Sequence, residues 1–334
     1  MFRSRPGCWH ERVPERSLAG SRDVTRQIMD TECQPQSQCL SHHVACEQVL
    51  DHARSVHDDR RVADQASTAF ANTRSVTNNR PVSGASSLPS DSSLLIGCCG
   101  WSEAKPKYFA DFPTVELQST FYEPPSLALA SKWRSLAPDS FQFCLKAWQL
   151  ITHTPASPTY RKLKSKLSVA EHELVGRFRP TEQVTLAWER TAAIARALEA
   201  RTVLFQCPAS FRPEPENLRN LRHFFSLIKR ERLELAWEPR GDWPSDLVAS
   251  LCEDFALLRC IDPFETDPTE VRAPYWRLHG KGGYSYRYSE DDLEDLWHVW
   301  HQCVTETNGP RYIFFNNIWM KEDALRFQQR VRSR

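Results

Sequence analysis

Eight polar residues lie at or just after the ends of short apolar segments, and their types could act together in one site. They are Glu116, Lys146, Gln206, Glu238, Arg240, Arg277, His279 and Asn316. Glu116, Glu238 and His279 are residue types that transfer protons, so we expect them to do acid–base chemistry. Lys146, Arg240 and Arg277 are expected to hold an anionic ligand, because their cationic groups bind carboxylates and phosphates.

The loops that follow two of these segments add candidate ligand contacts. One loop contains His153 and the basic stretch 161–166, and the other runs from Gly280 to Tyr288 with three tyrosines. Aromatic and basic residues together suit stacking on a base or sugar beside a phosphate. The basic stretch could equally be a solvated surface and the tyrosines packing residues, whereas the 280–288 loop suggests a lid. The predicted ligand-binding set is Lys146, His153, Gln206, Arg240, Arg277, Tyr288 and Asn316.

Eight strand-like segments must position these residues. They span 94–99, 114–120, 141–147, 202–207, 234–238, 255–261, 275–279 and 311–316. Helical patterns separate most of them, which is typical of a parallel sheet built from βαβ units. The span of 93–334 is close to the roughly 250 residues of a (β/α)₈ barrel. We therefore predict an α/β fold, a TIM-barrel-like (β/α)₈ barrel with some reduced helices.

The alternation within the segments predicts which side chains face the barrel axis. In 141–147, Phe141, Phe143 and Leu145 alternate with Gln142, Cys144 and Lys146, and strand side chains alternate between faces. If the apolar set packs on helices, the polar set lies inside, toward the C-terminal ends where barrel enzymes build active sites. The alternative is a purely structural network of buried ion pairs, such as Glu238 with Arg240 or Glu116 with Lys146.

Three helix starts can be recognised between the strands. Ser126 and Thr181 each precede an apolar-periodic stretch, and Ser289 with Asp292 resembles a capping box. The connections 102–113 and 262–274 are short for a crossover helix, so two helices are expected to be reduced or missing.

The first 92 residues differ from the rest. They contain no Lys and none of the eight Tyr, and their few aromatic residues are Phe2, Trp9 and Phe70. Such a segment buries too little surface to offset its ordering entropy, so we expect a disordered N-terminal extension and linker over 1–92 before a domain at 93–334. A zinc site in the extension is a weaker interpretation, because the spacing of its ligands matches no standard finger: Cys33, Cys39, His42, His43 and Cys46.

Composition excludes some classes of protein. The net charge of +1 gives no reason to expect bulk attraction to nucleic acid or membranes, and no apolar run reaches the roughly 20 residues of a membrane span. No charged-then-apolar signal peptide is present. We therefore expect a cytoplasmic protein without a membrane partner. Five cysteines inside apolar strands are expected to be reduced, buried thiols: Cys98, Cys99, Cys144, Cys207 and Cys260.

Several segments together resemble the YecE-like family, also called domain of unknown function 72. They are GCCGWS at 97–102, ELQSTFYEPP at 116–125, KAWQLITH at 146–153, SPTY at 157–160, FQCPASF at 205–211, AWEPRG at 236–241, RLHGKGGYSYRY at 277–288 and FNN at 315–317. KAWQLITH and AWEPRG are most similar to an archaeal-type branch. The resemblance implies a TIM-barrel-like fold, likened at the level of fold to endonuclease IV and xylose isomerase, and no reaction. Glu103 departs from the family, where many members have an aromatic residue.

Four functions fit these residues, with the cofactor unknown. The first is an enzyme or binder for a small anionic ligand, such as a phosphorylated sugar or nucleotide, with no metal. The second is a metal-dependent phosphodiesterase in which Glu116, Glu238, Asp262 and His279 hold a divalent ion. The third is a nucleic-acid-binding protein that uses 161–166 and 284–288. The fourth is Schiff-base chemistry at Lys146, with pairing to Glu116 as its structural alternative.

Overall fold

The computed structural model describes residues 94–266, 273–303 and 311–334. The chain divides into two units, residues 1–83 and 84–334, and the described residues belong to the second. The predicted disordered extension, its boundary near residue 92 and the alternative zinc ligands all lie outside the described residues. Those three interpretations stay predictions.

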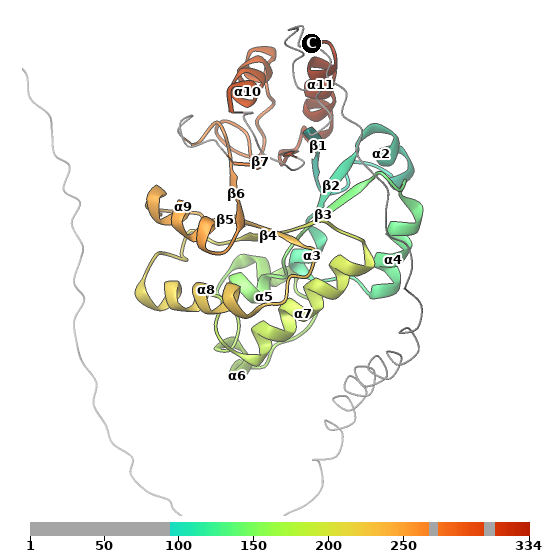
Figure 1. Ribbon diagram of the computed structural model, residues 1–334. Helices are drawn as coiled ribbons and strands as arrows, with labels where there is room; N and C mark the ends of the chain where they lie inside the picture. Colours follow the sequence, from blue (N-terminus) through green and yellow to red (C-terminus); the bar gives the residue numbers. More distant parts are fainter. Residues whose placement is uncertain (1–93, 267–272, 304–310) are drawn as a thin grey trace, which may run out of the picture. The chain divides into compact units, whose positions relative to one another are not determined.

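Eight parallel strands form a closed barrel in sequence order, from β1 next to β2 around to β8 next to β1. Figure 1 shows the helices outside the ring of strands. The predicted (β/α)₈ barrel is therefore confirmed. The strands are β1 Leu94–Cys99, β2 Thr114–Leu117, β3 Gln142–Lys146, β4 Thr202–Gln206, β5 Glu234–Glu238, β6 Leu257–Ile261, β7 Tyr275–Leu278 and β8 Arg311–Phe315.

The predicted helix starts are confirmed at their N-caps. The side chains of Ser126 and Thr181 accept hydrogen bonds from backbone N–H groups three residues later, at the starts of α4 and α7. Ser289 and Asp292 form reciprocal bonds before α10. The helices are α2 Lys105–Asp111, α3 Ser119–Tyr122, α4 Leu127–Leu136, α5 Gln149–Thr152, the 3₁₀ helix η2 Pro158–Lys162, α6 Val169–His172, α7 Glu182–Ala197, α8 Pro215–Leu227, α9 Ser245–Asp254, α10 Glu290–Cys303 and α11 Met320–Arg332.

Two connections are reduced, as their lengths predicted. Helix α2, between β1 and β2, has 7 residues, and the described part of the β6–β7 connection contains no helix. One predicted strand is shorter than expected: the segment 114–120 ends as a strand at Leu117, and Ser119 begins α3. The Thr120 hydroxyl lies within hydrogen-bond distance of the carbonyl oxygens of Leu117 and Lys146, so it fixes this turn against the end of β3.

The apolar side chains form two separate packing layers. The larger layer lies between strands and helices and includes Val115, Phe143 and Trp237. The smaller layer fills the barrel itself: Cys99, Cys144, Leu204, Ala236, Cys260, Tyr275, Tyr312 and Phe314. The predicted alternation is therefore confirmed, because polar side chains two residues further along these strands continue the inward-facing set toward the C-terminal ends.

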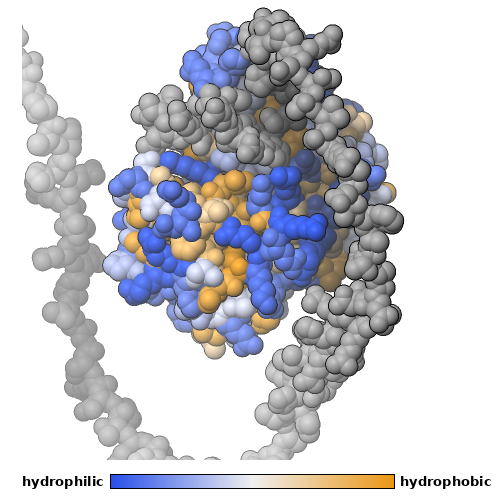
Figure 2. Space-filling view, in the orientation of Figure 1, coloured by the Kyte–Doolittle hydropathy of each residue, from blue (hydrophilic) through white to orange (hydrophobic). Residues whose placement is uncertain are grey.

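The five strand cysteines are buried free thiols, as predicted. Burial raises the pKa of Cys207 to about 12, although its thiol accepts a hydrogen bond from Trp237, so this thiol stays protonated and unreactive. In the part of the chain that the structure describes, no helix has the length and apolarity that crossing a membrane requires. The visible face of the molecule intermixes hydrophobic and hydrophilic side chains (Figure 2).

The loop after β7 is anchored by one carboxylate at the start of α10. Asp292 accepts hydrogen bonds from the side chains of Lys281 at 2.5 Å and Tyr286 at 2.8 Å, and from the Ser289 N–H at 2.7 Å. The backbone N–H of Gly280 also donates to the Tyr288 hydroxyl at 2.8 Å. These contacts fasten both ends of the segment that the sequence suggested as a lid.

Replacing Asp292 with Asn should destabilise the protein by roughly 1–3 kcal/mol. The neutral amide is a weaker acceptor than the buried carboxylate, so the hydrogen bonds from Lys281, Tyr286 and Ser289 weaken or are lost. Burial alone would raise the pKa of Asp292, but hydrogen bonds from Lys281, Ser289 and Tyr286 hold it below its usual value. The wild-type advantage should therefore be complete above about pH 4 and shrink as the pH falls further. Urea unfolding between pH 2 and 7 measures both effects.

The matched control is Asp291→Asn, an exposed carboxylate in the same first turn of α10. This variant should change the free energy of unfolding by less than about 0.5 kcal/mol. Equal losses in the two variants would show that Asp292 does not anchor the loop.

Candidate functional site

A buried arginine joins two glutamates across the inside of the barrel. Arg277, on β7, is 1% exposed. Its Nη2 lies 3.1 Å from Oε1 of Glu116, on β2, and its Nη1 lies 2.5 Å from Oε2 of Glu238, on β5. Burial alone would lower the pKa of Arg277, but the two carboxylates raise it well above its ordinary value. The guanidinium therefore stays charged and links opposite sides of the barrel.

Glu116 is the more enclosed of the two carboxylates. It is fully buried, and its Oε2 accepts a hydrogen bond from the Tyr275 hydroxyl at 2.6 Å. Its Oε1 also accepts bonds from Gln118 and from the Cys99 thiol. Burial and the charge of Glu116 raise the pKa of Tyr275, so the phenol stays a donor. These contacts make Glu116 part of the floor of the site.

Glu238, Arg240 and His279 line a cavity of about 550 Å³ at the C-terminal ends of β5, β6 and β7. Arg240 donates from Nε to Oε1 of Glu238 at 2.7 Å and from Nη2 to Nε2 of His279 at 2.6 Å. Burial alone would raise the pKa of Glu238, but Arg277 and Arg240 hold it well below its usual range. Glu238 is therefore a carboxylate at neutral pH.

The ring of His279 is held in one orientation. Its Nδ1 lies 3.1 Å from Oδ2 of Asp262, and its backbone N–H donates to the same oxygen at 2.8 Å. Since Arg240 can only donate, Nε2 of His279 accepts and the proton lies on Nδ1, toward Asp262. Both ring nitrogens are thus engaged.

Lys146 ends β3 on the inner face and is 7% exposed. Its Nζ lies 3.8 Å from the centre of the Phe121 ring, and it forms no ion pair with any carboxylate in the described ranges. The suggested Lys146–Glu116 pair is therefore absent there, because Arg277 takes that carboxylate. Burial, reinforced by the charge of Arg277, lowers the pKa of Lys146 to about 7, although Glu238 and Glu116 oppose the change.

His153 follows the one-turn helix α5 and contacts the same Phe121 ring as Lys146. Its ring packs edge-on against Phe121, with 4.9 Å between ring centres, and its Nδ1 lies 2.7 Å from the Thr152 hydroxyl. Burial lowers the pKa of His153 to about 3, with a further contribution from the charge of Lys146. The imidazole is therefore neutral at physiological pH.

The remaining predicted ligand contacts differ in their positions. The Oε1 of Gln206 accepts from Nη1 of Arg277 at 3.2 Å, which joins it to the cluster. Asn316 follows β8, and its backbone N–H donates to the Leu278 carbonyl. Tyr288 lies elsewhere: it is buried in the layer between strands and helices and stacks on Phe264. Its position is that of a packing residue, and its ligand contact stays a prediction.

Two residues of this site were absent from the predicted set. Tyr275 precedes Arg277 by two positions, so strand alternation places it on the same inner face and could have identified it. Phe121 lies in α3, one residue beyond the segment 114–120 that the sequence predicted as a strand. No periodicity marks a helix of 4 residues, so the sequence carries no signal for Phe121 beside Lys146.

A metal-dependent phosphodiesterase would need Glu116, Glu238, Asp262 and His279 to hold a divalent ion together. Among the residues that the structure describes, no three His, Cys, Asp or Glu side chains are grouped as metal ligands. Arg277 lies between Glu116 and Glu238, and His279 faces Asp262 through Nδ1. A divalent ion would have to displace a guanidinium, so this arrangement does not fit one.

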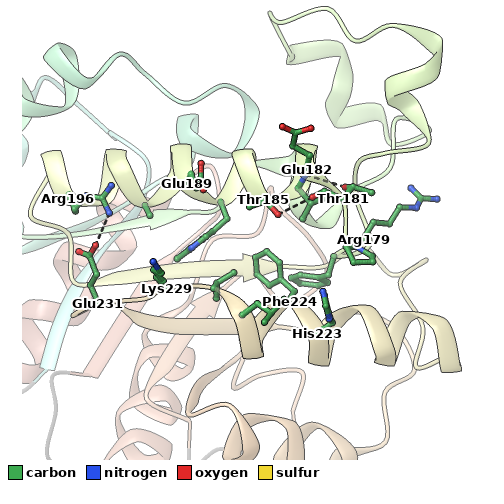
Figure 3. Close-up of a pocket in the computed structure, with 17 residues that line it drawn as sticks. Arg179, Thr181, Glu182, Thr185, Glu189, Arg196, His223, Phe224, Lys229 and Glu231 are labelled. Carbon is green, nitrogen blue, oxygen red and sulfur yellow. Dashed lines mark hydrogen bonds and ion pairs between the residues drawn. The ribbon is translucent and has the colours of Figure 1, made fainter. Parts of the chain in front are cut away.

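A second cavity of about 500 Å³ lies outside the barrel, between α7 and α8. Figure 3 shows its aromatic wall at Phe224 and its charged rim, where Arg196 pairs with Glu231 at 3.2 Å. It contains none of the predicted site residues. Sequence alternation gave no sign of this cavity, because it forms between two helices.

The fold and the mouth of the barrel together define a (β/α)₈ protein with a charged, partly buried site. A family model described as protein of unknown function DUF72 matches residues 95–334. The chain belongs to this family. The search of curated proteins found no match.

Two solved structures of DUF72 family proteins are similar to this chain. One, from Enterococcus faecalis, is 20% identical over 72% of this chain and 97% of its own, with a TM-score of 0.55. The other, from Thermotoga maritima, is 22% identical over 72% of this chain and 99% of its own, with a TM-score of 0.53. These likenesses support the fold and carry no information about the ligand.

Replacing Glu116 with Gln should destabilise the protein by roughly 3 kcal/mol, because Arg277 then keeps only one buried counter-charge. Chemical denaturation monitored by tryptophan fluorescence measures this loss. The control is Glu234→Gln, on β5 at the opposite end of the barrel, where the carboxylate pairs with the exposed Arg201. That variant should lose less than about 1 kcal/mol. Similar losses in both would contradict the role of Glu116 as a buried counter-ion.

Proposed function

We propose that the C-terminal mouth of the barrel binds a small anionic ligand of the phosphorylated sugar or nucleotide class. The observation that carries this proposal is the state of Arg240. Its Nε and Nη2 are held by Glu238 and His279, whereas Nη1 has no hydrogen-bond partner within the described residues. The side chain is 40% exposed and lines the cavity. A guanidinium fixed in this way presents a donor to an anion without further ordering.

Lys146 supports the same assignment from β3. Burial without a carboxylate partner disfavours its ammonium form, and a bound anion would supply the missing counter-charge. Arg277, in contrast, is enclosed by its two glutamates, so its contribution is to hold Glu238 in place beneath Arg240. In this proposal Arg240 and Lys146 contact the ligand, and Glu116 with Arg277 supports them.

Acid–base work at this mouth falls to Glu238 and His279 in the proposal. Both line the cavity, and His279 is oriented by Asp262. Nε2 of His279 is the ring atom that could accept a proton, because Nδ1 faces Asp262. Gln206, His153 and Asn316 complete the predicted ligand contacts.

Replacing Arg240 with Ala should weaken anion binding about tenfold or more, because a charge-assisted hydrogen bond contributes roughly 1.5–3 kcal/mol. Calorimetric titration with inorganic phosphate and with sn-glycerol 3-phosphate measures the affinity, and thermal unfolding measures the ligand-induced shift. Arg222→Ala is the control, since Arg222 pairs with Asp254 on the outer surface. Unchanged binding in the Arg240 variant would remove this residue from the site.

Nucleic-acid binding remains the second candidate, supported by exposed residues in two loops that follow strands. Arg161, Lys164 and Lys166 are exposed, and Tyr284 is 57% exposed. Contacts to a phosphate backbone would weaken steeply with salt. Oligonucleotide affinity that falls with salt, and that is lost when the three basic residues become Ala while phosphate binding persists, would favour this function.

A further inference from the structure

The side chain of Lys146 lies in a place where an amine could do more than neutralise charge. It ends a strand whose position is fixed by pairing with β4, where Lys146 lies opposite Leu204. Its carbonyl oxygen lies 2.7 Å from the Thr120 hydroxyl, which holds the backbone at this point. The amine is therefore presented at a defined position at the mouth of the barrel.

The two glutamates that could pair with this amine form ion pairs with arginines instead. Glu116 and Glu238 both bind Arg277, and Glu238 also binds Arg240. Lys146 instead lies against the face of Phe121, and the His153 ring packs against Phe121 in a T-shaped arrangement. The lysine thus lies against one aromatic face and feels the charge of Arg277, and among the described residues it has no ion pair to keep its nitrogen protonated.

We infer that Lys146 is a nucleophile that captures the carbonyl group of an anionic aldehyde or ketone as a Schiff base. This inference rests on the proposed function, because Arg240 would hold the anionic end of the ligand. The pKa of Lys146 near 7 supports it, since a large fraction of the amine is then neutral at physiological pH, and the neutral amine is the nucleophile.

The step balances without a redox partner. The nitrogen lone pair attacks the carbonyl carbon, the C–N bond forms, and the π electrons of the C=O bond move to oxygen. One proton passes from nitrogen to that oxygen and gives a carbinolamine. With a second proton from solvent the oxygen leaves as water, and the nitrogen lone pair closes the C=N bond of a protonated iminium ion.

The experiment uses two probes of nearly the same size and charge on the full-length protein. Dihydroxyacetone phosphate carries a ketone where sn-glycerol 3-phosphate carries an alcohol. Each is incubated at pH 7 with sodium cyanoborohydride, which donates a hydride to an iminium ion and makes the adduct permanent. We expect both probes to bind, and dihydroxyacetone phosphate alone to add the mass of one ligand less water plus two hydrogens. Peptide mapping should place this adduct on Lys146.

Two variants make the result specific. Lys146→Met keeps a side chain of similar length without an amine and should lose the adduct. Lys162→Arg is the matched control, because Lys162 also lies over an aromatic ring, 4.4 Å from the centre of Tyr122, but is exposed. This control should keep the full adduct. Thermal unfolding with sn-glycerol 3-phosphate shows whether each variant is folded and still binds an anion.

The outcomes separate the two proposals. If dihydroxyacetone phosphate binds but no adduct forms on Lys146, the Schiff-base inference is overturned and the anion site stands. An adduct spread over exposed lysines also overturns it. If neither phosphate binds to the wild-type protein, the proposed function fails, and the inference that rests on it fails as well.

Discussion

The buried ion network of Glu116, Arg277 and Glu238 is the constraint on which the site depends. Three charged side chains from β2, β5 and β7 lie inside the barrel, where desolvation is costly unless each charge is paired and hydrogen-bonded. Here each charge is paired, and Tyr275 adds a donor to Glu116. Because the partners come from strands across the barrel, the network also fixes how those strands meet at the mouth.

The pairing of Arg277 with both glutamates determines which partners remain for Lys146 and Arg240. Arg277 uses both glutamates as counter-ions, so Lys146 has none among the described residues, and Arg240 shares Glu238 at the rim. A different pairing, with Glu116 on Lys146, would leave a charged, inert lysine and a buried arginine with Glu238 as its one remaining counter-ion. The low pKa of Lys146 and the sharing of Glu238 between Arg240 and Arg277 therefore both follow from where the Arg277 guanidinium lies.

The sequence predicted the barrel well, because alternation and N-caps are local signals. Ser126, Thr181 and Ser289 each begin a helix, and polar residues on alternate strand positions converge at one mouth. Which charges pair could not be predicted, because pairing depends on distances between strands far apart in the sequence. The position of Tyr288 could not be predicted either. Its hydroxyl accepts a hydrogen bond from the Gly280 N–H of the same loop, and its ring packs in the layer between strands and helices.

Arg240 and Lys146, the two cations that the proposal assigns to the ligand, lie at different depths in the site. This difference in depth restricts the structure of the ligand more than the two charges do. Arg240 is 40% exposed at the rim, whereas Lys146 is 7% exposed and enclosed by Phe121. A dianion such as phosphate is strongly hydrated, so the exposed guanidinium is the better place for it. The deeper amine favours the less polar end of the same molecule, and a carbonyl carbon is a group that a buried, partly neutral amine can engage. A ligand with its charge at one end and a carbonyl a few bonds away satisfies both positions at once.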